Sequence, residues 1–185
     1  VCQGLTELDE PRADVTLACV RHEVELPVEP MPPAEESRAI IAELQPKMQA
    51  IEAGEEGLDR WGTEMGLRHA RARLEAIDSG EDIGGKKFSV QALAIGEVAL
   101  IGHPCEVFFQ IGEEIVAASP FAHTLTVTHA GGWNGYIPTA DAYPDGGYEV
   151  ERARANHMGL KILPESETIL VEESLKTLAE AKRLM

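Results

Sequence analysis

The feature that most constrains the fold is a pair of short apolar runs separated by a segment of helix length. Residues 97–102 and 124–128 have the length and composition of strands. Between them, residues 107–118 place Ile111 and Ile115 on one helical face. A strand, a helix and a second strand in this order form a right-handed crossover between parallel strands. The second half of the chain is therefore predicted to have an α/β fold with mixed layers.

Three further segments complete the second half. Residues 88–94 and 97–102 are expected to form a hairpin around Ile95-Gly96. Residues 130–148 are rich in Gly, Tyr and Pro and are expected to be a loop. Residues 165–184 carry apolar side chains at helical spacing, which predicts a closing amphipathic helix.

The first half has a different pattern. Residues 15–20 and 23–28 are predicted to be short strands of an edge hairpin, and the Pro-rich segment 30–33 to be a stiff connector. Apolar residues then recur at three-to-four spacing over residues 34–53 and 58–79. The short Gly-containing turn between these two segments predicts an antiparallel helical hairpin.

The chain thus divides into three parts. We expect edge strands and a connector over residues 1–33, a helical hairpin over 34–79, and an α/β core segment over 88–185. A loop at residues 82–87 joins the last two parts. On the hairpin, Trp61 is expected to serve packing rather than to bind a cofactor.

Composition excludes several classes of protein. The 32 acidic residues outnumber the 16 basic ones and give a net charge of -16, which repels phosphate backbones, so nucleic acid is not an expected partner. Cys2, Cys19 and Cys105 lack the spacing of a disulfide framework or a zinc knot. No apolar run has the length of roughly 20 residues that spans a bilayer.

Polar side chains follow both strands of the predicted crossover. His103 and Glu106 come directly after residues 97–102, and His129 and Tyr136 come after residues 124–128. The carboxyl ends of parallel strands meet at one edge of a sheet, where loops bind ligands. Two imidazoles, a carboxylate and a phenol at this edge outline a metal site or an acid/base site.

Glu106 also has a purely structural interpretation. It lies at the start of the predicted helix, where a carboxylate can cap free backbone amides and complement the helix dipole. The pattern of residues alone leaves both roles open.

Three segments give the chain a resemblance to a known family. They are Val-Ala-Leu-Ile-Gly-His-Pro-Cys-Glu at 98–106, Asn-Gly-Tyr-Ile-Pro-Thr at 134–139, and Gly-Tyr-Glu at 147–149. In residue identity and spacing they resemble the C-terminal part of the catalytic domain of the neutral/alkaline non-lysosomal ceramidases, especially shorter bacterial relatives. The resemblance runs from about His22 to the end of the chain. At Cys105 this sequence departs from the family, which has glycine there.

The resemblance implies a function and a set of roles. Members of this family are zinc amidases that cleave the N-acyl bond of ceramide, a sphingolipid. It implies that Glu106 is a carboxylate ligand of zinc, and that Tyr136 is a phenolic ligand that also acts in catalysis. His103 and His129 become candidates for residues that contact and orient these ligands without binding the metal themselves. The family's two histidine ligands lie in its N-terminal part, so the zinc would be shared with histidines outside this chain.

These inferences give one main expectation and two rivals. The main expectation is the C-terminal half of a ceramidase-like zinc hydrolase, inactive alone and completed by the N-terminal half of the same protein, with a lipid or small-molecule amide as substrate. One rival is a non-catalytic interaction domain that uses the acidic hairpin at 34–79. The other is a related hydrolase of another small amide or ester. A homo-oligomer is possible, and although family members are often secreted or periplasmic, the compartment is left open.

Overall fold

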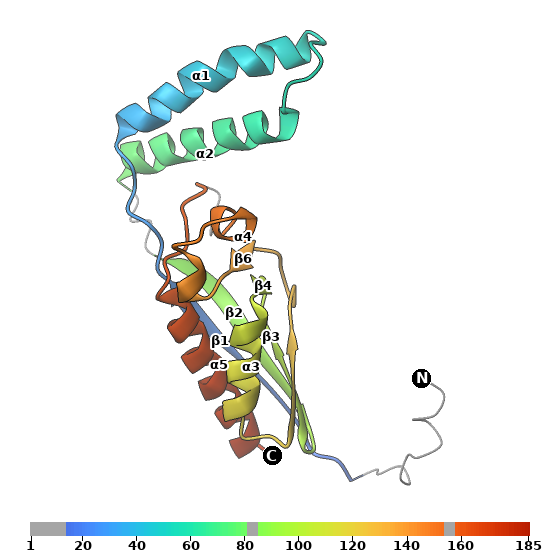
Figure 1. Ribbon diagram of the computed structural model, residues 1–185. Coiled ribbons are helices and arrows are strands. Elements are labelled where there is room, and N and C mark those ends of the chain that lie inside the picture. Colours follow the sequence, from blue (N-terminus) through green and yellow to red (C-terminus); the bar gives the residue numbers. More distant parts are fainter. Residues whose placement is uncertain (1–13, 81–84, 154–157) are drawn as a thin grey trace.

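The computed structural model of the chain describes residues 14–80, 85–153 and 158–185. Its main body is a four-stranded sheet with helices on one face, and two further helices stand at one end (Figure 1). Along the sheet the strand order is β1 (Leu17–Leu26), β2 (Lys86–Ile95), β3 (Val98–Gly102) and β5 (His123–Val127). The predicted mixed α/β fold is confirmed.

The crossover predicted in the second half is present. β2 and β3 pair in antiparallel fashion through a tight turn at Gly96, whose φ of 57° suits glycine. The chain then passes through α3 (Phe109–Ala118) and returns as β5, parallel to β3. The final helix, α5 (Ser166–Arg183), packs against β1 and β2 and touches α3.

The core lies between the sheet and helices α3 and α5. Its fully buried side chains come from both layers and include Phe88, Ile101, Ile111, Leu170 and Leu178. Burying one such side chain contributes roughly 1.5–3 kcal/mol, so this layer is what holds the strands of the crossover in place. None of the helices in the described ranges combines the length and apolarity required to cross a membrane.

The predicted edge hairpin at residues 15–20 and 23–28 is wrong. The structure has one continuous strand, β1, which pairs with β2 along its whole length. The break that was expected at residues 21 and 22 does not exist, and Arg21 and Glu23 are exposed members of an unbroken alternation. His22, between them, binds Glu180 of α5 at 2.8 Å, so its polar ring is satisfied on the helix side.

The predicted helical hairpin is confirmed as α1 (Ala34–Glu52) and α2 (Arg60–Ser79). Asp59 caps α2 by accepting a bond from the Gly62 amide at 2.9 Å, and Gly80 ends it in the left-handed conformation. Figure 1 shows both helices beyond the end of the sheet, on the side of α4 (Tyr148–Glu151). Trp61 does not serve core packing as expected, because it is 54% exposed.

Two loop predictions need correction. The segment 130–148 contains a short strand, β6 (Tyr136–Ile137), and a 3-10 helix at Ala140–Ala142. β6 forms because it pairs with β4 (Glu106–Val107), a contact that a glycine-rich composition does not reveal. The loop expected at 82–87 falls partly on residues 81–84, outside the described residues, whereas 86 and 87 belong to β2.

Candidate functional site

The ends of β3 and β5 lie at the same edge of the sheet, as predicted. Gly102 and Val127 are register partners in the parallel pair. The connection continues past both strands, since the His103 amide donates to the Val127 carbonyl at 2.9 Å and the Ala130 amide donates to the His103 carbonyl at 2.9 Å. The segments that follow the two strands therefore leave the sheet side by side.

A second, two-stranded ribbon brings Glu106 and Tyr136 together. β4 and β6 run parallel, and Glu106 and Tyr136 are direct register partners. The Glu106 amide donates to the Gly135 carbonyl at 2.8 Å, and the Phe108 amide donates to the Ile137 carbonyl at 3.0 Å. Thirty residues separate the two side chains in sequence, and the ribbon holds them at neighbouring positions.

The Glu106 carboxylate has two further polar neighbours. The Trp133 indole Nε1 donates to its Oε1 atom at 3.3 Å, and the His129 Nε2 atom lies 3.6 Å from the same oxygen. The Glu106 side chain is 32% exposed, so solvent still reaches the carboxylate. Glu106, His129, Trp133 and Tyr136 will be called the Glu106 cluster.

The phenol of Tyr136 is held in its protonated form by this setting. Partial burial raises the pKa of Tyr136, and a hydrogen bond with the Glu106 carboxylate and the negative charges of Glu106 and Glu149 raise it further. A protonated phenol beside a carboxylate is a hydrogen-bond donor. A cation between the two oxygens would act in the opposite direction and favour the phenolate.

His129 adopts a backbone conformation that its residue type rarely takes. Its φ is 56°, the only positive value at a residue other than glycine in the described ranges. Such a conformation costs free energy in most residues and is retained where the surroundings fix it. Here the amide of His129 donates to the Cys105 carbonyl at 3.3 Å, which directs the chain back toward Glu106.

His103 does not join the Glu106 cluster. Its ring is fully buried and its Nε2 atom lies 2.9 Å from the Ser174 hydroxyl of α5. Because the Ser174 hydroxyl donates to the Leu170 carbonyl, it accepts a hydrogen bond from the Nε2–H group of His103, and the buried Nδ1 atom is left without a partner among the described residues. Burial lowers the pKa of His103 to about 4, so the ring is neutral at pH 7.

Glu106 is not a helix cap, contrary to the structural interpretation. Helix α3 begins after Phe108, two residues beyond Glu106, and no side chain bonds to its first amides. The carboxylate instead belongs to β4 and contacts the loop after β5. The helix dipole therefore gives no account of why an acidic residue is at this position.

The sequence pattern did not identify two aromatic residues near Glu106. Trp133 bonds to the carboxylate, and Tyr148 packs edge-to-face on Tyr136 with 5.9 Å between the ring centroids. Trp133 lies within the glycine-rich segment that follows β5, and this position was the sequence signal that could have placed it near the site. Tyr148 belongs to the Gly-Tyr-Glu segment of the resemblance, but nothing in its spacing pointed to a contact with Tyr136.

The donor atoms of the Glu106 cluster suit a zinc ion in kind. Zinc is bound by carboxylate oxygen and imidazole nitrogen, and the cluster offers both together with a phenol. In the described residues, no three His, Cys, Asp or Glu side chains gather closely enough to hold a metal. Cys105 is buried, and burial and the Glu106 charge raise the pKa of its thiol to about 12. The cluster therefore fits part of a zinc site.

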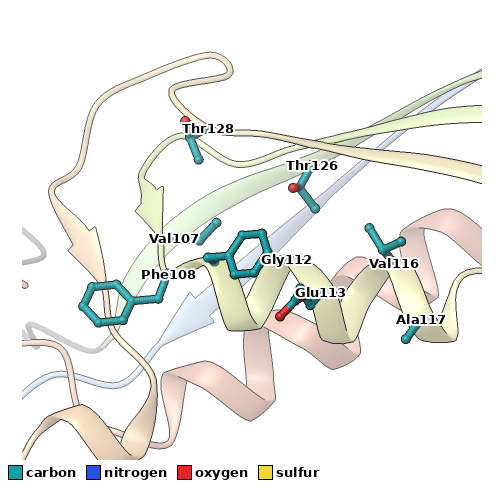
Figure 2. A pocket seen from close by; sticks show the side chains of 9 residues that line it. Val107, Phe108, Gly112, Glu113, Val116, Ala117, Thr126 and Thr128 are labelled. Carbon is teal, nitrogen blue, oxygen red and sulfur yellow. The ribbon is translucent and has the colours of Figure 1, made fainter.

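An apolar groove lies beside the site rather than within it. It has a volume of about 580 Å³ and runs between α3 and the β5 side of the sheet (Figure 2). Its lining includes Val107, Phe109, Val116 and Thr128, and neither Glu106 nor Tyr136. Since successive side chains of a strand point to opposite faces, Val107 faces this groove from the side opposite to Glu106.

Two solved structures resemble part of this chain. One is a ceramidase complexed with C2, at 19% identity and a TM-score of 0.43, covering 54% of this chain and 15% of that chain. The other is the neutral ceramidase from Pseudomonas aeruginosa, at 21% identity and a TM-score of 0.42, covering 52% of this chain and 16% of that one. The matched region thus spans about a sixth of these longer proteins. No protein-family model matches the chain, and no curated protein does.

Proposed function

We propose that this chain supplies Glu106 and Tyr136 to a zinc site that hydrolyses an N-acyl amide bond. The observation that carries the proposal is the register pairing of Glu106 with Tyr136 at an exposed edge, with His129 and Trp133 on the same carboxylate. The remaining ligands are histidines from outside this chain, as the sequence resemblance implies. The chain is then the C-terminal half of a ceramidase-like hydrolase.

The chain's own residues have distinct tasks in this proposal. Glu106 binds the metal through its carboxylate, while Trp133 and His129 fix the direction of that carboxylate by contacts to Oε1. The phenol of Tyr136, the register partner of Glu106, would complete the chain's share of the site and interact with the oxygen of the amide as negative charge develops there. Zinc, when bound, supplies an activated water at neutral pH and polarises the carbonyl.

The test uses the longer protein to which we assign this chain. We expect about one zinc per wild-type molecule by mass spectrometry and much less in Glu106→Gln, with loss of amide hydrolysis. Tyr136→Phe should lower the zinc content less than Glu106→Gln does, but should lose roughly 10²- to 10³-fold in kcat, because the group beside the oxyanion is gone. Glu114→Gln, an exposed site on α3, controls for the change in charge.

The outcome that contradicts the proposal is specific. If Glu106→Gln retains its zinc and its activity, the cluster is not part of the metal site. The 185-residue chain alone, with a partial ligand set, should carry little zinc. Stoichiometric zinc on this chain alone would contradict the shared site.

A second candidate function has one observation in its favour. Helix α1 buries only Ser37 and Ile51 and packs mainly on α2, while its apolar residues Ile41, Leu44 and Met48 stay half-buried. This surface suits a partner-binding hairpin. That function predicts partner capture that survives Glu106→Gln and Tyr136→Phe together. It fails if a chain without residues 34–79 binds the same partner equally well.

A further inference from the structure

Arg152 lies directly after α4, between the Glu106 cluster and the helical hairpin. Its guanidinium carbon is 4.8 Å from the centroid of the Trp61 ring and 5.5 Å from the centroid of the Tyr148 ring. Trp61 belongs to the first turn of α2, whereas Tyr148 begins α4. Guanidinium groups stack on aromatic faces, so two rings from separate elements hold this cation in one place.

Within the residues that the structure describes, the guanidinium of Arg152 has aromatic neighbours but no polar partner. The residue is exposed, and no carboxylate or carbonyl of the described chain accepts a bond from its guanidinium. Two nearby cations are engaged, because Lys161 pairs with Glu151 at 2.8 Å and Arg73 donates to the Met158 carbonyl at 2.8 Å. In a chain with a net charge of -16, a guanidinium that is fixed in place and lacks an acidic partner is suited to an anionic ligand.

Arg152 is also close to the reacting groups. The Tyr148 ring on which it lies packs edge-to-face against Tyr136, with 5.9 Å between centroids. Tyr136 in turn pairs with Glu106. In Figure 1, α4 lies between the helical hairpin and β6. A small molecule that reacts beside Glu106 and Tyr136 can therefore extend across Tyr148 and reach Arg152 with its other end.

We infer that Arg152 binds a carboxylate of the substrate, so that the site prefers N-acyl amides that carry a carboxylate over neutral ones. This assignment of substrate class rests on the proposed function. A planar guanidinium binds a carboxylate through two parallel hydrogen bonds. Arg152 carries a single positive charge, which matches the single negative charge of a carboxylate, whereas a phosphate dianion calls for more donors.

Equilibrium binding tests the inference without requiring turnover. The probes are N-octanoylglycine and N-octanoylethanolamine, which share an acyl chain and an amide but differ in the carboxylate. In the full-length protein, calorimetry should show the anionic probe binding roughly tenfold more tightly, the value of one charge-assisted bond. Arg152→Gln should abolish this preference. Arg68→Gln, an exposed residue of α2 with the same change in charge, should retain it.

Each outcome decides the inference. Equal binding of the two probes, binding of neither, or a preference that survives Arg152→Gln overturns it. A variant that loses thermal stability while keeping the preference would mean that Arg152 is only a clamp between α2 and α4. The Glu106→Gln experiment is separate. If Glu106→Gln loses zinc and turnover but Arg152→Gln keeps the carboxylate preference, the proposed function stands and the inference fails. If Glu106→Gln keeps both but Arg152→Gln loses the preference, Arg152 binds carboxylates in a protein whose function is not the proposed one.

Discussion

His103 connects the candidate site to helix α5 through a bond that depends on protonation. The neutral ring donates from Nε2 to Ser174 and lies three residues before Glu106 in the same segment. A charge on this buried ring would lose its hydration, and burial therefore lowers the pKa of His103 to about 4. The edge of the sheet is therefore built for a neutral histidine.

This arrangement predicts a pH dependence of stability. The unfolded histidine takes up a proton near pH 6.5, whereas the folded one does so only near pH 4, so the unfolded state binds more protons between these values. The free energy of unfolding should fall as pH drops from 6.5 to 4, by on the order of 3 kcal/mol at most. Urea denaturation of the wild type and His103→Gln across this range measures it. Equal slopes in both proteins would show that His103 has no such effect.

Helix caps decide how well the hairpin forms, since α1 and α2 bury little outside each other. Asp59 accepts the Gly62 amide at 2.9 Å and is the residue that begins α2. Asp59→Ala removes this acceptor and should lower the free energy of unfolding by about 1 kcal/mol. Asp59→Asn keeps an oxygen at the same position and should cost much less. Thermal unfolding followed by circular dichroism compares the three proteins, and matching losses in both variants would argue against capping.

At the level of elements, long periodic segments could be predicted and short ones could not. The spacing of apolar residues in α1, α2, α3 and α5 reflects burial of one helix face, which is a local property. β4 and β6 are two residues each and form only because the chain brings residues 106 and 136 together. The same long-range pairing creates the contact of Glu106 with Tyr136, so the residues were predicted but their geometry was not.

A related limit applies to side chains that bond across elements. The break expected at Arg21 and His22 is absent, and the partners of these two side chains lie far away in the sequence, in β2 and α5. For Trp61, the helical spacing predicted packing but did not reveal its contact with Arg152, which is 91 positions further along the chain. Patterns in sequence record burial well, but they do not record which distant residue satisfies a polar or aromatic group.

In the molecule as a whole, the hairpin depends on a small contact with the C-terminal segment. Arg73 of α2 is buried and donates from Nε to the Met158 carbonyl at 2.8 Å and from a terminal nitrogen to the Gly159 carbonyl at 3.4 Å. Around it, Ala76 packs with Met158 and Leu160. Gly159 has a φ of 69°, and a side chain here would clash with His69, so α2 and this segment fit closely.

Loss of this contact should loosen the hairpin and leave the sheet intact. Arg73→Gln shortens the side chain and removes both bonds, at a cost of roughly 2 kcal/mol. Hydrogen exchange followed by mass spectrometry should then show faster exchange in residues 34–79, with unchanged protection in β2 and β3. Arg68→Gln serves as the exposed control. Uniformly faster exchange in the hairpin and the sheet would show that the two parts unfold as one unit.

The position of α5 also determines when the sheet can be completed during synthesis. His22 in β1 binds Glu180 in α5, 158 residues later, and the buried side chains of β2 and β3 face the same helix layer. Closing so long a loop is entropically costly, and contacts between distant segments slow folding. On the ribosome the strands emerge long before their covering helix. A chain interrupted ahead of residue 166 exposes Phe88, Val90 and Ile101, and is the form most prone to aggregate or to need a chaperone.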